Sequence, residues 1–497
     1  MRLADAVAQS PGLADFYGSN GLKPIFMGEA GAARRAAVIN AVAQAESHGL
    51  PAQRYHMARL MVLDAEGGTS VDAELAFAKA LADWSHDLGG GVLNPQRIDS
   101  TFKREVLRRK TGDVMREFGA SATPAAVLEG LAPKDPRYQI LRNALAPANR
   151  LVAPAGTPMV PEVLLREGAQ GDAVLALRTR LAAVGFDAGG AAQPDVFDMP
   201  LTLAVRSFQD ATGLPADGVA GPRTIRMLNH GRGEANPAIL VALERMRWMT
   251  GHDLNARHVW VNLPEYNARI MEGGHEVFVT RVVIGKAKVD FETPEFSDEM
   301  EHLVVNPRWN VPRSITVREY LPRLQANRHA VSHLDVVDGS GNVISRDRIN
   351  FGQYTAANFP YRMRQKPSDD NALGVVKFMF PNPWNIYLHD TPTKHLFDQS
   401  QRAYSHGCIR IGRPRDLAFE LMKGSYDDPQ ATFNRALESG RETYLNLRPT
   451  IPVHLVYFTA FPDESGQIRY YSDIYDRDAK VYAALAKLGV ASAATDE

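Results

Sequence analysis

The chain has 497 residues, of which 45% are apolar and 23% are charged, and its formal net charge is −1. This composition predicts globular domains with substantial hydrophobic cores, about three of them at roughly 150 residues each. The near-zero charge excludes a global field that would favour nucleic acid. No run approaches the roughly 18 apolar residues of a membrane helix, so no transmembrane segment is predicted.

Residues 1–157 have the sequence pattern of helices and carry no recognisable chemistry. Apolar residues recur at spacings of three and four in 35–50 and 70–88, as they do on the buried face of a helix. Ser70 followed by Glu74 is a helix-start signal. We interpret 1–157 as a helical scaffold domain with a structural or docking role.

Residues 158–232 follow a linker that contains proline and glycine, and they predict a compact unit of three helices. The first helix is expected after Asp172 and ends at Gly185, a typical helix-terminating residue. The segments 205–209 (VRSFQ) and 217–222 (DGVAGP) resemble the small three-helix peptidoglycan-binding domain. The resemblance implies a cell-wall polymer as partner, with the module acting either as a binder or as a spacer.

Residues 233–497 change to short runs rich in β-branched side chains, for example 258–262 and 276–284. These runs predict a mostly antiparallel β-domain. The less regular, charge-rich segment 307–374 is interpreted as an insertion that caps the site, and strands and a helix in 450–497 are expected to close the domain. The predicted fold class is therefore α+β multidomain.

Cys408 is the only cysteine in the chain, so it cannot form an internal disulfide. Lone cysteines are usually small buried hydrophobes, but polar and charged neighbours suit a thiolate better. Those neighbours are Ser405, His406, Gly407 and Arg410. A zinc site built from Cys408, His406 and His389 is an alternative, disfavoured because there is one thiolate and no Cys-x-x-Cys spacing. We predict a cysteine nucleophile that needs no metal and no cofactor.

A thiol near its usual pKa of about 8.5 needs a base, and two histidines are candidates. His389 ends a predicted strand, 386–389, in which Tyr387 shares its face, and Asp390 follows directly. His406 precedes Cys408 by two residues, and alternation would place both on one strand face. We favour His389, because it has a neighbouring carboxylate, and keep His406 as the alternative.

Gly407 has no side chain to obstruct a peptide carbonyl that approaches Cys408. The backbone N–H groups of Gly407 and Cys408 are therefore predicted to stabilise an oxyanion. Alternation also brings Arg410 to the face of Cys408. The pattern thus predicts a thiol, two imidazoles and a guanidinium around one point.

The motif 405–410 (SHGCIR), with 389–392 (HDTP) upstream, resembles the signature of the L,D-transpeptidases with a YkuD-type catalytic domain. Residues 305–312, 371–374 and 385–389 match as well. With the helical front and the peptidoglycan-binding module, these motifs are similar to the large YcbB-like subgroup of Gram-negative bacteria.

The resemblance implies roles for individual residues of this chain. Cys408 matches the nucleophile and His389 the base, while His406 and Gly407 fall in the part of the motif that shapes the oxyanion region. Substrate binding is expected from Tyr387, Asp390, Ser405 and Arg410, with Asp390 also placed to orient the base. Many family members carry Asn where this chain has Arg410, so the role of that Asn is not transferred.

The family reaction is the transfer of a peptidoglycan stem peptide. Cys408 would attack the third residue of a donor tetrapeptide, meso-diaminopimelate, and expel the terminal D-alanine. Transfer to an acceptor stem would make a third-to-third crosslink, and transfer to water would be L,D-carboxypeptidase activity. The alternatives are a cysteine hydrolase that cuts crosslinks and a catalytically silent wall-binding scaffold.

The expected location follows from this substrate. A crosslinking enzyme must reach polymerised wall, so the mature protein is expected in the periplasm, and wall-synthesis proteins are candidate partners. The first residues lack the apolar core of a secretory signal. A leader or anchor is therefore expected outside this sequence.

Overall fold

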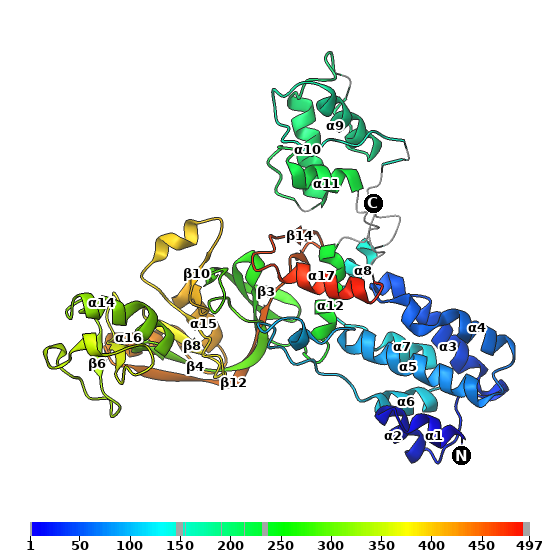
Figure 1. Ribbon diagram of the computed structural model, residues 1–497, viewed down its shortest axis with the longest axis horizontal. Helices are drawn as coiled ribbons and strands as arrows, with labels where there is room; N and C mark the ends of the chain where they lie inside the picture. The colour runs from blue at the N-terminus through cyan, green and yellow to red at the C-terminus, as the bar shows by residue number, and fades with distance from the viewer. Residues whose placement is uncertain are drawn as a thin grey trace. The chain divides into compact units, whose positions relative to one another are not determined.

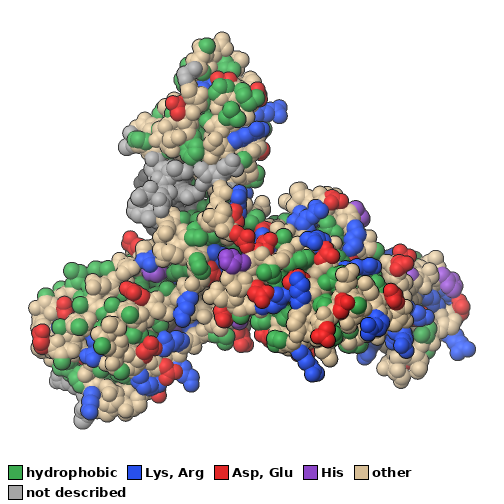
Figure 2. Space-filling view, turned by 180° about the vertical axis from the view of Figure 1, so that it is seen from behind, with side chains coloured by type: hydrophobic (Ala, Val, Ile, Leu, Met, Phe, Trp, Pro, Cys, Tyr) green, Lys and Arg blue, Asp and Glu red, His purple; other side chains and the backbone are tan. Residues whose placement is uncertain are grey.

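The computed structural model describes residues 2–145, 153–154, 156–189, 191–212, 214–230 and 237–490 (Figure 1). The chain forms two compact units, Met1–Asp253 with Phe458–Glu497, and Leu254–Tyr457. The predicted α+β class is confirmed: helices fill the N-terminal part, and a large sheet forms the second unit. Within the described ranges, no helix combines the length and apolar character needed to cross a membrane. Figure 2 shows basic and acidic side chains interspersed on the face that it displays.

The N-terminal part of the first unit is helical, as predicted. Its helices are α1 (Arg2–Val7), α2 (Pro11–Ser19), α3 (Ala32–Val42), α4 (Met57–Ala65), α5 (Val71–Gly90), α6 (Thr111–Ala120), α7 (Pro124–Glu129) and α8 (Pro136–Ala144). Ser70 caps α5 by accepting a hydrogen bond from the backbone N–H of Ala73 at 3.1 Å. The helix predicted over 35–50 is shorter than expected, because α3 ends at Val42 and a 3₁₀ turn, Ala45–His48, follows.

The three-helix module consists of α9 (Asp172–Ala183), α10 (Met199–Thr212) and α11 (Pro222–His230). It has its own hydrophobic core, to which Leu177 and Phe208 belong. The Gln209 amide donates to the Asp217 carboxylate at 2.9 Å and accepts from the Gly218 N–H at 2.9 Å. This buried link fixes the loop before α11, which explains why glutamine and Asp-Gly stand at these spacings.

The end of the chain packs in the first unit. Helix α12 (Pro237–Trp248) contacts helix α17 (Arg477–Lys487), and β13 (Ala460–Pro462) pairs with β14 (Ile468–Tyr470). Arg245 of α12 binds Asp478 of α17 at 3.1 Å. The boundaries expected from sequence therefore differ from this division, because both α12 and the last strands lie with the helical unit.

A nine-stranded mixed sheet forms the second unit, in the order β10-β3-β11-β9-β8-β4-β12-β1-β2. Strand β2 also pairs with β3, so the sheet closes on itself and leaves no free edge around the ring. The strands are β1 (His258–Asn262), β2 (Asn267–Glu272), β3 (His275–Gly285), β4 (Phe296–Val305), β8 (Val376–Met379), β9 (Leu388–His389), β10 (Ala403–Ser405), β11 (Ile409–Ile411) and β12 (Thr443–Val456). Helices α15 (Pro414–Met422) and α16 (Pro429–Glu438) lie between β11 and β12 in the sequence.

The segment between β4 and β8 forms a small subdomain, which we call the cap. It contains a three-stranded sheet of β5 (Trp309–Asn310), β7 (Arg362–Gln365) and β6 (Asp335–Val337). Helices α13 (Arg313–Ile315) and α14 (Leu321–Ala326) flank a π-helical turn, Thr316–Tyr320. The cap has a hydrophobic core of its own, which includes Leu324, Phe351 and Met363.

Glu244 and Arg247 of α12 form an ion pair at 2.7 Å whose two side chains are fully buried. Glu244 also accepts from the Leu93 N–H at 2.8 Å and from the Trp248 indole at 3.1 Å. Because all these donors lose their acceptor together, we expect Glu244→Leu to lower the free energy of unfolding by about 3–5 kcal/mol. Chemical denaturation measures this change.

The control is Glu162→Leu, because Glu162 is 44% exposed where it pairs with Arg226. Exposed pairs contribute about 0–1 kcal/mol, so this variant should unfold close to the wild type. Equal stabilities for the two variants would contradict the role given to Glu244.

Candidate active site

Cys408 lies in a tight turn between two strands. Strand β10 ends at Ser405 and β11 begins at Ile409, and Gly407 between them has a φ of +114°, which favours glycine. The prediction that His406 and Cys408 alternate on one strand face is therefore wrong. The turn interrupts the alternation, so the side chains of His406 and Cys408 do not share a strand face.

Strand β9 brings the second predicted segment beside Cys408. It comprises only Leu388–His389 and pairs in parallel with β11, with Ile409 opposite Leu388 and Arg410 opposite His389. The Ile409 N–H donates to the Tyr387 carbonyl at 3.1 Å. This register places Tyr387 level with Cys408.

The thiol of Cys408 is partly exposed and has three polar neighbours. Its Sγ donates to the Asn385 carbonyl at 3.5 Å. Burial raises the pKa of Cys408 to about 11, while the backbone and hydroxyl of Tyr387 and the Arg410 charge all act to lower it. The thiol is therefore protonated at neutral pH.

The Tyr387 hydroxyl connects the thiol to the cap. Burial raises the pKa of Tyr387 well above its ordinary value, and its contact with Cys408 adds to this effect. The Trp309 side chain, on β5 of the cap, acts on the Tyr387 hydroxyl and has a smaller, lowering effect on its pKa. Tyr387 is thus a neutral hydroxyl that can donate a hydrogen bond to the sulfur as negative charge develops there.

His389 is buried and held in one tautomer. Its Nδ1 lies 2.5 Å from the Asp390 carbonyl, which can only accept, so the proton is on Nδ1 and Nε2 is unprotonated. Burial, and then the charge of Arg410, lower the pKa of His389 to about 4. The imidazole is therefore neutral at pH 7. Among the described residues, Asn385, Tyr387 and Arg410 act on Sγ, and the imidazole is not among these groups.

The side chain of Asp390 stabilises the local backbone. Its carboxylate accepts from the backbone N–H groups of Thr391 at 2.7 Å and Val375 at 2.9 Å and pairs with Lys394. A Cβ on Gly374 would lie 2.2 Å from this carboxylate, which explains the glycine of the motif 371–374. Asp390 therefore orients His389 through its backbone carbonyl, while its carboxylate, on a side chain that is 9% exposed, holds a loop.

Ser405 shapes the turn around Cys408. Its hydroxyl donates to the Cys408 carbonyl and accepts from the Gly407 N–H at 3.1 Å. The Gly407 carbonyl accepts from Thr293 at 2.7 Å. The Gly407 N–H is thus already used, so the expectation that it stabilises an oxyanion is corrected. The Cys408 N–H has no acceptor among the described residues and keeps this role.

His406 faces the cap. Its Nε2 lies 2.6 Å from Glu319, and its ring packs edge-on against Phe291 at 4.9 Å. The ion pair Arg318–Asp290 at 3.2 Å also links the cap to a loop of the large sheet. These contacts assign His406 to the junction of the turn and the cap.

Arg410 is half-buried on the face of β11 shared with Cys408. Its Nη1 donates to the Thr393 hydroxyl at 3.0 Å, and burial lowers its pKa. Its charge acts on both Cys408 and His389. Within the described ranges, no group of three His, Cys, Asp or Glu side chains is arranged to hold a metal ion.

Four residues of the site were not predicted from sequence: Trp309, Asn385, Thr293 and Glu319. Asn385 has a φ of +55°, a conformation that asparagine tolerates better than most residues. An asparagine just before the predicted strand could therefore have indicated a turn at this point. Trp309 lay in the motif 305–312 but carried no stated role. Thr293 and Glu319 gave no signal, because their partners are distant in sequence.

Comparisons with known proteins agree with these observations. Residues 256–430 match the family model of the L,D-transpeptidase catalytic domain (YkuD), residues 11–145 match a scaffold domain, and residues 170–228 match a "Putative peptidoglycan binding domain". A curated protein of Haemophilus influenzae, named "Putative L,D-transpeptidase", is 33% identical over 225 residues. That match covers 45% of each chain, so this chain spans less than half the length of its relative.

Two solved structures are also similar in part. One is an L,D-transpeptidase from Xylanimonas cellulosilytica, at 17% identity over 61% of this chain and 99% of that chain. The other is a fused Zn-dependent amidase/peptidase/peptidoglycan-binding protein from Clostridium acetobutylicum, at 12% identity over 60% of this chain and 100% of that chain. Their TM-scores of 0.15 and 0.16 are too low to bear on the fold of this chain.

The raised pKa of Cys408 predicts a steep pH dependence of alkylation. Because the thiolate forms only as pH approaches about 11, the rate should rise about tenfold per pH unit from about pH 7 to about pH 9.5. Intact mass after iodoacetamide treatment measures the rate, and the label reports Cys408 alone because the chain has no other cysteine. A plateau near neutral pH would contradict the raised pKa.

The effect of the Tyr387 hydroxyl on the thiol predicts that Tyr387→Phe makes Cys408 less reactive. Losing one donor to the thiolate, worth about 1 kcal/mol, should lower the alkylation rate at pH 8 about fivefold. Tyr444→Phe is the matched control, because Tyr444 is 58% exposed and lies on β12. Equal rates for the two variants would remove Tyr387 from the activation of the thiol.

Proposed function

We propose that this chain, in which residues 256–430 match the L,D-transpeptidase catalytic domain (YkuD) and residues 170–228 match a "Putative peptidoglycan binding domain", is a peptidoglycan L,D-transpeptidase that acts through a thioester on Cys408. The donor is a tetrapeptide stem whose third residue is meso-diaminopimelate. The acceptor is the side-chain amine of a second stem, and the product is a third-to-third crosslink.

The observation that carries this proposal is the neutral pair of Cys408, directly before β11, and His389, on the neighbouring strand β9. An acyl-transfer base must be unprotonated at working pH, and His389 meets this condition because its pKa is lowered to about 4. Its Nδ1–H is held by the Asp390 carbonyl, so Nε2 is the atom that can take the thiol proton. The backbone carbonyl takes the orienting role that a carboxylate has in serine-type triads.

The first half of the reaction acylates the enzyme. Nε2 of His389 takes the proton of Sγ, and Sγ attacks the carbonyl carbon of the diaminopimelate residue. The Cys408 N–H is placed to donate to the oxyanion, and Tyr387 and Arg410 stabilise negative charge at sulfur. The bond to D-alanine then breaks, and the proton on Nε2 passes to the leaving amine.

The second half transfers the acyl group. The amine of the acceptor stem attacks the thioester carbonyl and gives a proton to His389, and Sγ leaves and is protonated again. Water in place of the amine gives a carboxypeptidase product instead. The cap contacts the turn through Glu319, and it contacts Tyr387 through Trp309. We therefore infer that the cap controls which acceptor enters the site.

The remaining parts of the proposal follow from the substrate. The donor and acceptor stems are the partners at the active site, and the peptidoglycan-binding domain is proposed to contact the same polymer. The site of action is then the periplasm, where polymerised wall is found.

The test is intact mass after brief exposure to a disaccharide-tetrapeptide. We expect the wild type to gain the mass of the substrate less D-alanine, and Cys408→Ala to gain nothing. His389→Ala should slow acylation at least about a hundredfold. His406→Ala is the matched comparison and should stay near the wild-type rate, because His406 faces Glu319.

If His406→Ala acylated far more slowly than His389→Ala, the base would be His406 instead of His389. Adding an acceptor stem and analysing the products then separates transfer from hydrolysis. Crosslinked dimers are the expected product, whereas tripeptide alone would identify a carboxypeptidase. Absence of any adduct and any product would leave a wall-binding protein without activity.

A further inference from the structure

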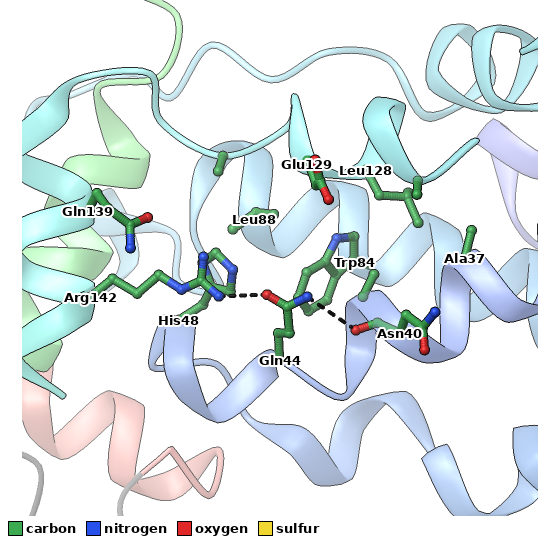
Figure 3. A pocket seen from close by; sticks show the side chains of 13 residues that line it. Ala37, Asn40, Gln44, His48, Trp84, Leu88, Leu128, Glu129, Gln139 and Arg142 are labelled. Carbon is green, nitrogen blue, oxygen red and sulfur yellow. Dashed lines mark hydrogen bonds between the residues drawn. The ribbon is translucent and has the colours of Figure 1, made fainter. Parts of the chain in front are cut away.

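The scaffold domain contains a pocket of about 320 Å³, far in sequence from the catalytic residues. Figure 3 shows it among the helices of the N-terminal part, with Trp84 in the middle of the view and His48 and Arg142 to one side. Its lining side chains come from α3, the 3₁₀ turn after it, α5, α7 and α8. Sites for small ligands have volumes of about 300–1,000 Å³, so the pocket is large enough for a short peptide.

A positive charge without an acidic partner lies at this pocket. Arg142 donates to Gln44 at 2.6 Å and to Ser47 at 2.9 and 3.1 Å, and among the described residues no carboxylate pairs with it. Both partners are neutral, so they hold the guanidinium in place without neutralising it. Figure 3 shows Arg142 reaching Gln44 across the pocket wall. A held and unneutralised guanidinium is suited to a carboxylate ligand.

Two buried side chains add further polar groups. Trp84 is 2% exposed, and its indole N–H has no acceptor among the described residues. Unpaired buried donors are rare, and a ligand carbonyl is the kind of partner that this one lacks. His48 bonds Tyr138 through Nδ1 at 3.0 Å. Burial, followed by the charges of Arg142 and Arg247, lowers the pKa of His48 to about 3, so the imidazole is neutral.

The rest of the lining mixes apolar side chains with the amides of Asn40, Gln44 and Gln139 and one carboxylate. Ala37, Leu88 and Leu128 supply the apolar surface, and Glu129 is exposed at the rim. A ligand that fits has carboxylates for Arg142, a carbonyl for Trp84 and an amine for Glu129. Short peptides with free carboxylates and a free amine have these groups, and peptidoglycan stems are of this class.

We propose that this pocket is a second, non-catalytic site that binds a peptidoglycan stem peptide through its carboxylates. The identity of the peptide rests on the proposed function, whereas the preference for a carboxylate rests on Arg142 alone. A second site would hold wall strands to the enzyme independently of the chemistry at Cys408.

The experiment is photo-crosslinking of the full chain with a stem tetrapeptide that carries a diazirine at its amino end. Mass spectrometry of the digested protein locates the label. We expect one set of labels in residues 37–48, 84–88 and 125–142, and a separate set in 385–410. A neutral, amidated all-L tetrapeptide with the same diazirine is the probe control and should not label the first set.

Two variants test the contacts. Arg142→Gln should lower labelling of the first set about tenfold and leave the second set unchanged. Arg59→Gln is the matched control, because Arg59 is exposed and pairs with Asp72. Trp84→Phe should also weaken the first set severalfold, because it removes the indole N–H. Since Trp84 packs against His48 and Tyr55, the smaller ring should also lower the melting temperature, and labelling is therefore compared at a temperature where this variant is folded.

The outcomes separate this proposal from the proposed function. Labelling of the first set without the second would support the scaffold site and count against catalysis at Cys408. Labelling of 385–410 alone, equal labelling by the neutral probe, or equal labelling of Arg142→Gln and the wild type would each overturn the scaffold site.

Discussion

The left-handed backbone of Gly407 is the constraint on which the catalytic site depends. It lies in the three-residue turn between the end of β10 at Ser405 and the start of β11 at Ile409, and this turn presents Cys408. Ser405 and Thr293 hold this turn from both sides with hydrogen bonds to backbone groups. Their bonds use the Gly407 N–H and carbonyl and leave the Cys408 N–H for an oxyanion. A side chain at Gly407 would strain the turn that places the nucleophile.

Burial keeps both reacting groups uncharged at rest. It raises the pKa of Cys408 and lowers that of His389, so the resting pair is a thiol and a neutral imidazole. Such a pair reacts only when a substrate brings the carbonyl, which limits unwanted reactions of a lone cysteine. In the proposed mechanism, Tyr387 and Arg410 stabilise the negative charge that appears on sulfur. Desolvation therefore favours selectivity by keeping the resting thiol protonated, and the local donors favour the rate by stabilising the thiolate.

The cap is connected to the chemistry by two side chains. Glu319 binds His406 beside the turn, and Trp309 acts on Tyr387, which in turn acts on the thiol. Since the cap has its own core, it can act as one body on both contacts. The reactivity of Cys408 can thus be coupled to whatever the cap contacts. The proposed pocket in the scaffold domain would add a wall contact outside this catalytic unit.

The sequence by itself determined the fold class and the helical character of the N-terminal part, and it singled out Cys408 as the candidate nucleophile. It could do so because helix periodicity, β-branched runs and the neighbours of a single cysteine are local properties. It misplaced His406 relative to Cys408, because the positive φ of Gly407 interrupts a strand that alternation treats as continuous. Trp309, Glu319 and Thr293 reach the site only after the sheet closes and the cap folds over. The scaffold pocket, formed by side chains from four helices and a turn, likewise exists only in the tertiary structure.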